Sequence, residues 1–149
     1  MASVGPGQRR EIIAMKFLVA GFLLLHGLVH LSFLSSRPAG TTVANWPWEL
    51  GSSWALSPLG VQTDALRAFA IGLLVIVIAG YLLAGLALTG VLSRRLWRPA
   101  IVIGSVASIA MLGAFFHQWL ALGVIIDAVL LWVVLVVRWV PKAPVVAAR

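Results

Sequence analysis

Residues 65–89 read ALRAFAIGLLVIVIAGYLLAGLALT, and the only charge in this stretch is Arg67, close to its start. A helix that spans a bilayer needs about 20 mostly apolar residues, within a range of roughly 17–25. The stretch meets that length. After Arg67 it contains no charged side chain that would be costly to place in the hydrocarbon layer. Residues 65–89 therefore predict a transmembrane helix.

Three further apolar segments flank this one, at about residues 12–34, 99–117 and 120–140. Pro99 suits the first turn of the third segment, and Pro141 stops the fourth. The turn expected at residues 115–119 is short, so the third and fourth helices should be antiparallel neighbours. We predict an all-α fold in which residues 1–149 form a single integral membrane domain, a four-helix transmembrane bundle.

The composition favours a membrane protein over a soluble one. Apolar residues make up 62% of the chain and charged residues 10%, whereas a soluble domain has about 45–50% and about 25%. The mean hydropathy is +1.07. The chain has no cysteine, which excludes disulfides, iron–sulfur clusters and thiolate zinc sites. No hydrolase or phosphate-binding motif is present, so the sequence favours a protein that is not an enzyme.

The basic residues are distributed as membrane topology signals. The net charge is +7, but the charges lie between apolar segments and form no single patch of the kind that binds nucleic acid. Nine of the eleven basic residues flank the chain ends or occupy the second connection: Arg9, Arg10, Lys16, Arg94, Arg95, Arg98, Arg138, Lys142 and Arg149. Only Arg37 and Arg67 fall on the other side. Because cytoplasmic loops carry the excess of Lys and Arg, we predict that both termini are cytoplasmic. The expected partner is the lipid bilayer, not nucleic acid.

The first apolar segment, residues 12–34, follows basic residues, as the apolar part of a secretory signal peptide does. However, it exceeds the roughly 7–15 residues usual for a signal peptide. No Ala-x-Ala cleavage site follows it, and His26 and His30 interrupt it. We therefore expect a retained transmembrane helix.

The first outer connection, about residues 35–64, is rich in tryptophan, with Trp46, Trp48 and Trp54 close together. Tryptophan favours the headgroup layer of a membrane. We expect this extracytoplasmic loop to lie on the outer membrane surface as an interfacial anchor, or to fold back over the bundle as a lid. Ser52 or Ser53 suits the cap of a short interfacial helix, and Asp64 suits the N-cap of the second transmembrane helix.

Small residues recur at intervals of four along two of the predicted helices. They are Ala68 and Gly72, then Gly80 and Ala84, on the second helix, and Ala100, Gly104 and Ser108 on the third. Helices in membranes associate through close packing of such residues. The pattern predicts that the second and third helices pack closely, and a homodimer face is the alternative.

Three ionisable residues fall well inside the apolar segments: His26, His30 and Asp127. A buried Asp costs about 2.5–3.5 kcal/mol at a helix centre, so such groups usually face a bundle interior and have partners. His26 and His30 are four residues apart and share one helix face. At a rise of about 1.5 Å per residue, all three lie about 6–12 Å below the outer ends of their helices. We predict that Asp127 points inward, within hydrogen-bonding or water-bridged reach of His26 or His30.

Several roles are open for this polar site, which His117 and Gln118 border at the outer rim. The three buried groups can fasten the first helix to the fourth, carry protons, or bind a quinone-like carbonyl. Two histidines and a carboxylate also suit zinc or another divalent metal. Haem would need His26 or His30 opposite His117, and their depths match poorly. No cofactor is assigned. The sequence favours a structural or accessory membrane component, and the alternative is part of a redox or transport system.

Four segments carry a resemblance to known proteins: His26-Gly-Leu-Val-His-Leu31, Trp46-Pro-Trp-Glu-Leu50, Ser53-Trp-Ala-Leu56 and Gly123-Val-Ile-Ile-Asp127. Together they resemble a family of small, uncharacterised bacterial four-helix integral membrane proteins. In size and helix number the chain is also loosely similar to DoxX-like proteins. The resemblance implies a multi-pass protein of the bacterial cytoplasmic (inner) membrane. It implies no activity. Other membrane proteins, or a second copy of the chain, are the macromolecular partners to expect.

Overall fold

The computed structural model describes residues 5–42 and 45–139, and these residues form helices and turns with no strand. The long helices are α1 (Pro6–Val29), α2 (Thr63–Thr89), α3 (Trp97–Ala114) and α4 (Ala121–Leu135). Short 3-10 helices adjoin them: η1 (His30–Leu34), η3 (Ser57–Leu59), η4 (Arg94–Leu96) and η5 (Gln118–Leu120). With these extensions the described chain contains four helical segments of 18 to 27 residues that are long and apolar enough to cross a membrane. The predicted all-helical architecture is therefore confirmed.

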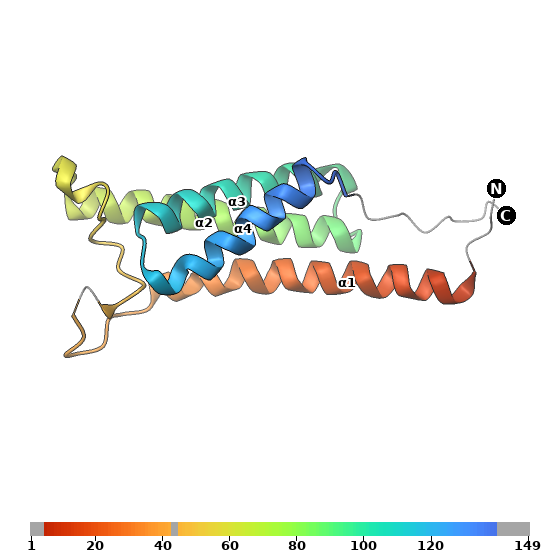
Figure 1. Cartoon of the computed structure of the whole chain (residues 1–149), viewed down its shortest axis with the longest axis horizontal. Coiled ribbons are helices and arrows are strands. Elements are labelled where there is room, and N and C mark those ends of the chain that lie inside the picture. Colours follow the sequence, from red (N-terminus) through yellow and green to blue (C-terminus); the bar gives the residue numbers. More distant parts are fainter. Residues whose placement is uncertain (1–4, 43–44, 140–149) are drawn as a thin grey trace.

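Consecutive long helices run in opposite directions (Figure 1). The start of α1, the α2–α3 connection and the end of α4 share one end of the molecule, and the long loop lies at the other. The most extensive packing joins α2 to α3, followed by α1 to α2 and α3 to α4. No comparably extensive packing joins α1 to α4 within the described residues. The space between α1 and α4 is where the polar site lies.

Glycine allows α2 and α3 to approach closely, as the sequence predicts. A Cβ atom added to Gly80 would lie 2.7 Å from the Gly104 Cα and 2.9 Å from the Ala100 carbonyl oxygen. These neighbours are backbone atoms, which cannot give way as a flexible side chain can. The prediction is wrong for Ala68 and Gly72. Both are exposed, because α2 meets α3 through its other face.

The helix boundaries differ from the predicted ones by a few residues. The first helix starts at Pro6 rather than near residue 12, because the polar residues that follow Pro6 continue the helix beyond the apolar run. α2 starts at Thr63 with Gln62 as its N-cap, so Asp64 lies in the first turn and is not the cap. An acidic residue there still interacts favourably with the helix dipole. α3 ends at Ala114 rather than near residue 117, since the chain turns at Phe115.

The fourth helix ends at Leu135, about five residues before the predicted end. Arg138 has a positive φ of 52°, a left-handed conformation that is incompatible with a continuing α-helix. The Arg98 guanidinium donates a hydrogen bond of 2.8 Å to the Arg138 carbonyl oxygen and so ties this turn to the start of α3. Val140, Pro141, Lys142 and Arg149, on which part of the prediction rested, lie outside the described residues.

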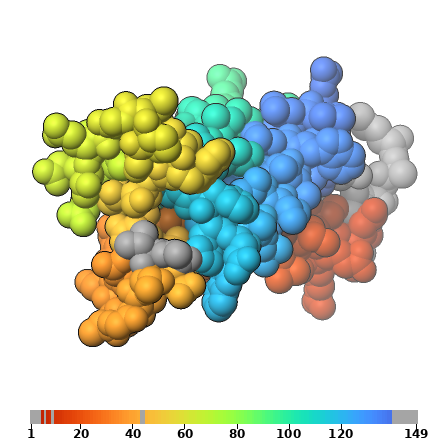
Figure 2. All heavy atoms as spheres, turned by 60° about the vertical axis from the view of Figure 1, so that its left-hand side comes forward, coloured from red at the N-terminus to blue at the C-terminus, as the bar shows by residue number. Residues whose placement is uncertain are grey.

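The long loop is attached to the end of α3. Ser53 is buried, and its hydroxyl donates to the Ala114 carbonyl oxygen and accepts from the Leu56 backbone N–H. The indole of Trp54 donates to the Gly113 carbonyl oxygen at 2.7 Å. The last carbonyls of a helix have no partner inside the helix, so the loop satisfies them. Figure 2 shows the loop, in orange to yellow, forming one end of the molecule beside α4.

The three loop tryptophans have different surroundings. Trp48 is half-buried and packs edge-on against Phe33, with 5.1 Å between ring centroids. Trp46 is also half-buried. Trp54 is 68% exposed, although its indole makes the hydrogen bond to Gly113. Part of the loop therefore packs on the bundle and part of it faces outward.

Candidate functional site

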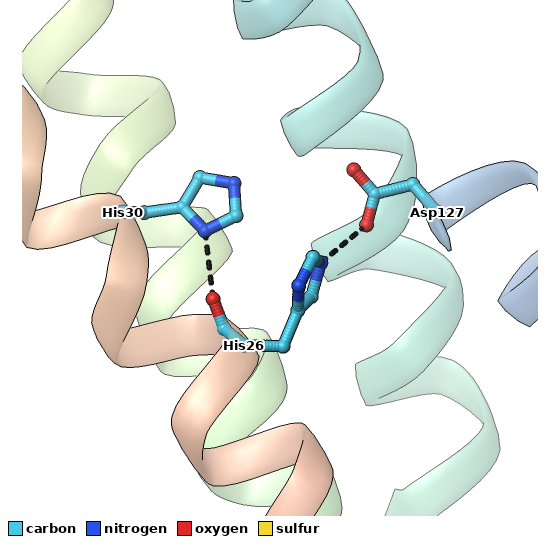
Figure 3. Close-up of side chains that lie close together, drawn as sticks. All are labelled: His26, His30 and Asp127. Atoms are coloured by element: carbon cyan, nitrogen blue, oxygen red, sulfur yellow. Dashed lines mark hydrogen bonds and ion pairs between the residues drawn. The ribbon is translucent and has the colours of Figure 1, made fainter. Parts of the chain in front are cut away.

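The candidate site is a cluster of polar side chains buried between α1, α2, α3 and α4. His26 lies on α1, and His30 lies one turn further along, at the junction with η1, so both occupy the same face. Asp127 lies on α4. The three side chains point toward one another (Figure 3). His26 is 7% exposed, His30 is 3% exposed and Asp127 is fully buried.

The predicted contact between Asp127 and a histidine is present. The His26 Nε2 atom lies 2.9 Å from Asp127 Oδ1, and the two residues join helices that otherwise pack little against each other. A carboxylate only accepts hydrogen bonds, so Nε2 of His26 carries the proton and donates. In a neutral imidazole the other ring nitrogen, Nδ1, then presents a lone pair.

Tyr81 is part of this cluster and was missed by the sequence analysis. Its hydroxyl donates to Asp127 Oδ1 and lies 2.9 Å from the Ser105 hydroxyl, so Ser105 donates in turn to Tyr81. Gly27 makes room for this tyrosine, since a Cβ atom there would lie 2.8 Å from the Tyr81 Cβ. A signal was available: Tyr81 is the only tyrosine of the chain and lies inside an apolar helix, where its hydroxyl needs a partner.

His30 is held by two hydrogen bonds that define its tautomer. Nδ1 lies 2.9 Å from the His26 carbonyl oxygen, which can only accept, so Nδ1 carries the proton. Nε2 therefore presents a lone pair and accepts from the Ser108 hydroxyl at 2.9 Å. Ser108 belongs to the predicted series of small residues on α3, and its spacing gave no sign of the bond to His30.

One fully buried oxygen of the cluster has no hydrogen-bond partner among the described residues. Asp127 Oδ1 accepts from both His26 and Tyr81, whereas Oδ2 is buried and accepts no hydrogen bond from residues 5–42 or 45–139. Buried polar atoms are nearly always paired, and an exception indicates strain, a functional role, or a missing water or ion. One oxygen of the carboxylate thus accepts two hydrogen bonds, and the other accepts none from the described residues.

A cavity of about 360 Å³ lies against the histidines, between α1 and α4. This volume is within the range of about 300–1,000 Å³ that is common for ligand sites. Among the described residues that line it, only His26 and His30 are ionisable. The other lining residues are apolar or aromatic: Phe22, Leu25, Val29, Phe33, Trp48, Leu112, Trp119, Leu120, Leu122, Gly123 and Ile126. Leu25 and Leu122 are 71% and 66% exposed, so the cavity opens sideways between the two helices.

His117 and Gln118 do not join the cluster. His117 lies in the turn after α3, where its Nδ1 accepts from the Trp119 backbone N–H at 3.3 Å, and Gln118 is exposed. His117 lines a different cavity, of about 240 Å³, beneath the loop residues Trp46 and Trp54. Within the described residues the opposed histidines that haem requires are therefore not brought together.

No protein-family model, curated protein or solved structure matches this chain. Function therefore has to be argued from the site itself. The site combines a lipophilic cavity, two buried histidines, and a carboxylate with one oxygen that has no hydrogen-bond partner among the described residues. Such a combination can bind a small amphiphilic molecule, pass a proton along His26 to Asp127, or hold a cation.

Proposed function

We propose that the chain is a multi-pass protein of the bacterial cytoplasmic membrane that binds a small lipophilic molecule between α1 and α4. Large apolar side chains exposed around the four helices support membrane insertion: Leu18, Leu25, Val75, Ile103, Leu122 and Leu135 are all more than half exposed. An apolar surface of this extent is unusual for a soluble protein. A bilayer would cover it.

Both termini face the cytoplasm in this proposal. Among the described basic residues, seven belong to the end of the bundle where α1 starts and α4 ends: Arg9, Arg10, Lys16, Arg94, Arg95, Arg98 and Arg138. Only Arg37 and Arg67 belong to the loop end. The positive-inside rule places the first group in the cytoplasm.

Single-cysteine variants test this topology, and the natural chain has no cysteine to remove. Ser52 and Ser93 are exposed at opposite ends. In intact cells, a membrane-impermeant thiol reagent should label Ser52→Cys but not Ser93→Cys. Both should react after the cells are opened. The reverse pattern would refute the orientation.

The cavity favours a ligand with a lipophilic body and a hydroxyl at one end. Its walls are apolar, and its lateral opening would face lipid tails, from which such a molecule could enter. When His26 is neutral and its Nε2 donates to Asp127, Nδ1 is an acceptor. A hydroxyl, such as that of a quinol, matches this acceptor better than the carbonyl of a quinone does. The observation that carries the proposal is the juxtaposition of the histidines with this cavity.

Ligand binding can be measured by titrating a short-chain quinol into the purified protein in detergent. Trp48 and Trp119 line the cavity, so we expect saturable quenching of tryptophan fluorescence. Val29→Phe fills the cavity and should weaken binding. Leu18→Phe is the matched control, because Leu18 is also exposed on α1 but does not line the cavity. Equal, non-saturating quenching in both variants would indicate partition into the detergent and refute the proposal.

A second candidate is a structural or accessory component in which the cluster only fastens α1 to α4. The observation in its favour is that His26, His30 and Tyr81 all have hydrogen-bond partners. This role predicts that Asp127→Leu destabilises the bundle and that the quinol does not bind saturably to the wild-type protein.

A further inference from the structure

We propose that His26, His30 and Asp127 form a binding site for a divalent transition metal ion, with zinc as the first candidate. The site does not depend on the lipophilic ligand proposed above, because it rests on the buried cluster and not on the cavity. Two histidines and one carboxylate are an established ligand set for zinc and for non-haem iron(II) sites that keep an open coordination position.

The three side chains present possible metal-ligand atoms near one another. One ligand atom from each of the three residues can be chosen so that all lie within 4.8 Å of one another. A tetrahedral zinc ion with bonds of about 2.0–2.2 Å would hold its ligand atoms about 3.3–3.6 Å apart. His26 Nε2 and Asp127 Oδ1 are already 2.9 Å apart. Ligand atoms up to 4.8 Å apart would have to draw closer together around an ion.

The unpartnered oxygen of Asp127 is an independent indication of a ligand. In the part of the chain that the structure describes, Oδ2 is fully buried and accepts no hydrogen bond, although Oδ1 of the same carboxylate accepts two. A buried acceptor that is left unsatisfied costs about 1–3 kcal/mol. A cation bound beside the carboxylate would satisfy Oδ2 and compensate its charge.

The histidine tautomers are compatible with metal binding. His30 donates through Nδ1 to the His26 carbonyl, a common way of orienting a metal-binding histidine, and this leaves the Nε2 lone pair toward the cluster. That lone pair accepts only a hydroxyl hydrogen bond from Ser108, which the metal would replace. His26 Nε2 carries a proton in the metal-free cluster. The ion would take the place of that proton, which would be released to solvent.

Tyr81 would serve as a positioning residue for the metal-binding carboxylate. Its hydroxyl donates to Asp127 Oδ1, and Ser105 holds the hydroxyl in place. Hydrogen-bond donors to a ligating carboxylate orient it, and their loss usually lowers metal affinity about 10–100-fold.

Titration of the full-length protein with cobalt(II) tests the site. The protein should be purified in detergent through a tag without histidines and stripped with a chelator. We expect one cobalt ion per chain, detected by its visible ligand-field absorption, with displacement by zinc. His26→Gln, His30→Gln and Asp127→Asn should each lower the affinity by more than the ~10–100-fold that loss of an outer partner costs.

Two further variants separate metal binding from folding. His117→Gln is the matched control, because His117 is the only other histidine and lies outside the cluster. It should leave the cobalt affinity unchanged. Tyr81→Phe keeps all three ligands and should weaken binding about 10–100-fold while helicity, followed by circular dichroism, is retained. The proposal would be overturned if the wild-type protein bound cobalt no more tightly than the His26→Gln variant, or if His117→Gln abolished binding.

Discussion

The cluster predicts a specific stability pattern for Asp127→Leu and its rescue by a second substitution. The leucine removes the acceptor of two buried donors, the His26 Nε2–H and the Tyr81 hydroxyl. Tyr81 can turn its hydrogen to Ser105, which lies 2.9 Å away. For His26 Nε2 no second acceptor lies within hydrogen-bond distance among the described residues. One stranded donor costs about 1–3 kcal/mol, and two would cost about 2–6 kcal/mol.

The double variant His26→Leu/Asp127→Leu should recover most of this loss. It removes donor and acceptor together, and replacing a buried polar pair by apolar groups is often neutral or stabilising. Asp127→Asn should keep the fold, because the amide oxygen can still accept from His26. The free energy of unfolding can be measured by titrating a denaturing detergent into mixed micelles and following helicity.

The order of stabilities distinguishes a stranded hydrogen-bond donor from poor packing of the leucine. We expect Asp127→Leu to be the least stable, with the double variant and Asp127→Asn closer to the wild-type protein. If the double variant were as unstable as Asp127→Leu, the loss would come from poor packing of leucine rather than from a stranded donor. If Asp127→Leu were as stable as wild type, the hydrogen bonds of Asp127 would contribute nothing.

Two other substitutions test the packing of the bundle. Gly80→Ala should destabilise the protein by about 1–3 kcal/mol, because the added Cβ would meet backbone atoms of α3 at 2.7 and 2.9 Å. Gly72→Ala is its control, since nothing lies within 4 Å there, and equal effects in detergent unfolding would argue against close packing at Gly80. Ser53→Ala should lower the stability of the loop by about 1–2 kcal/mol, because two hydrogen bonds are lost. Ser52 is exposed, so Ser52→Ala should change little. The rate of protease cleavage in the loop measures both effects.

Much of the fold was predictable because a membrane helix has a strong local signature. Length and apolar composition alone located four helices, and the cost of a buried carboxylate predicted that Asp127 would meet a histidine. The end of α4 was not predictable in this way. The Arg138 turn is tied to Arg98, forty positions earlier in the chain. No sequence pattern near residue 138 predicts that contact.

The candidate site was half predictable for a similar reason. His26 and His30 share a face by helix periodicity, which sequence spacing contains. Tyr81 and Ser105 come from two other helices, and their rotation about the helix axes depends on how α2 and α3 pack. Because any of several faces of an apolar helix can turn inward, the partners of Asp127 could be named only by residue type and depth.

The sequence alone determined that this chain is helical, that its four long segments are apolar enough for a membrane, and that three ionisable groups lie within them. These properties follow from residue composition and from helix rise, both of which are local. The tertiary structure decided which histidine bonds to Asp127, which oxygen of the carboxylate is left free, and that a cavity opens between α1 and α4. Each of these depends on the rotation and crossing of helices distant in sequence, which side-chain packing determines.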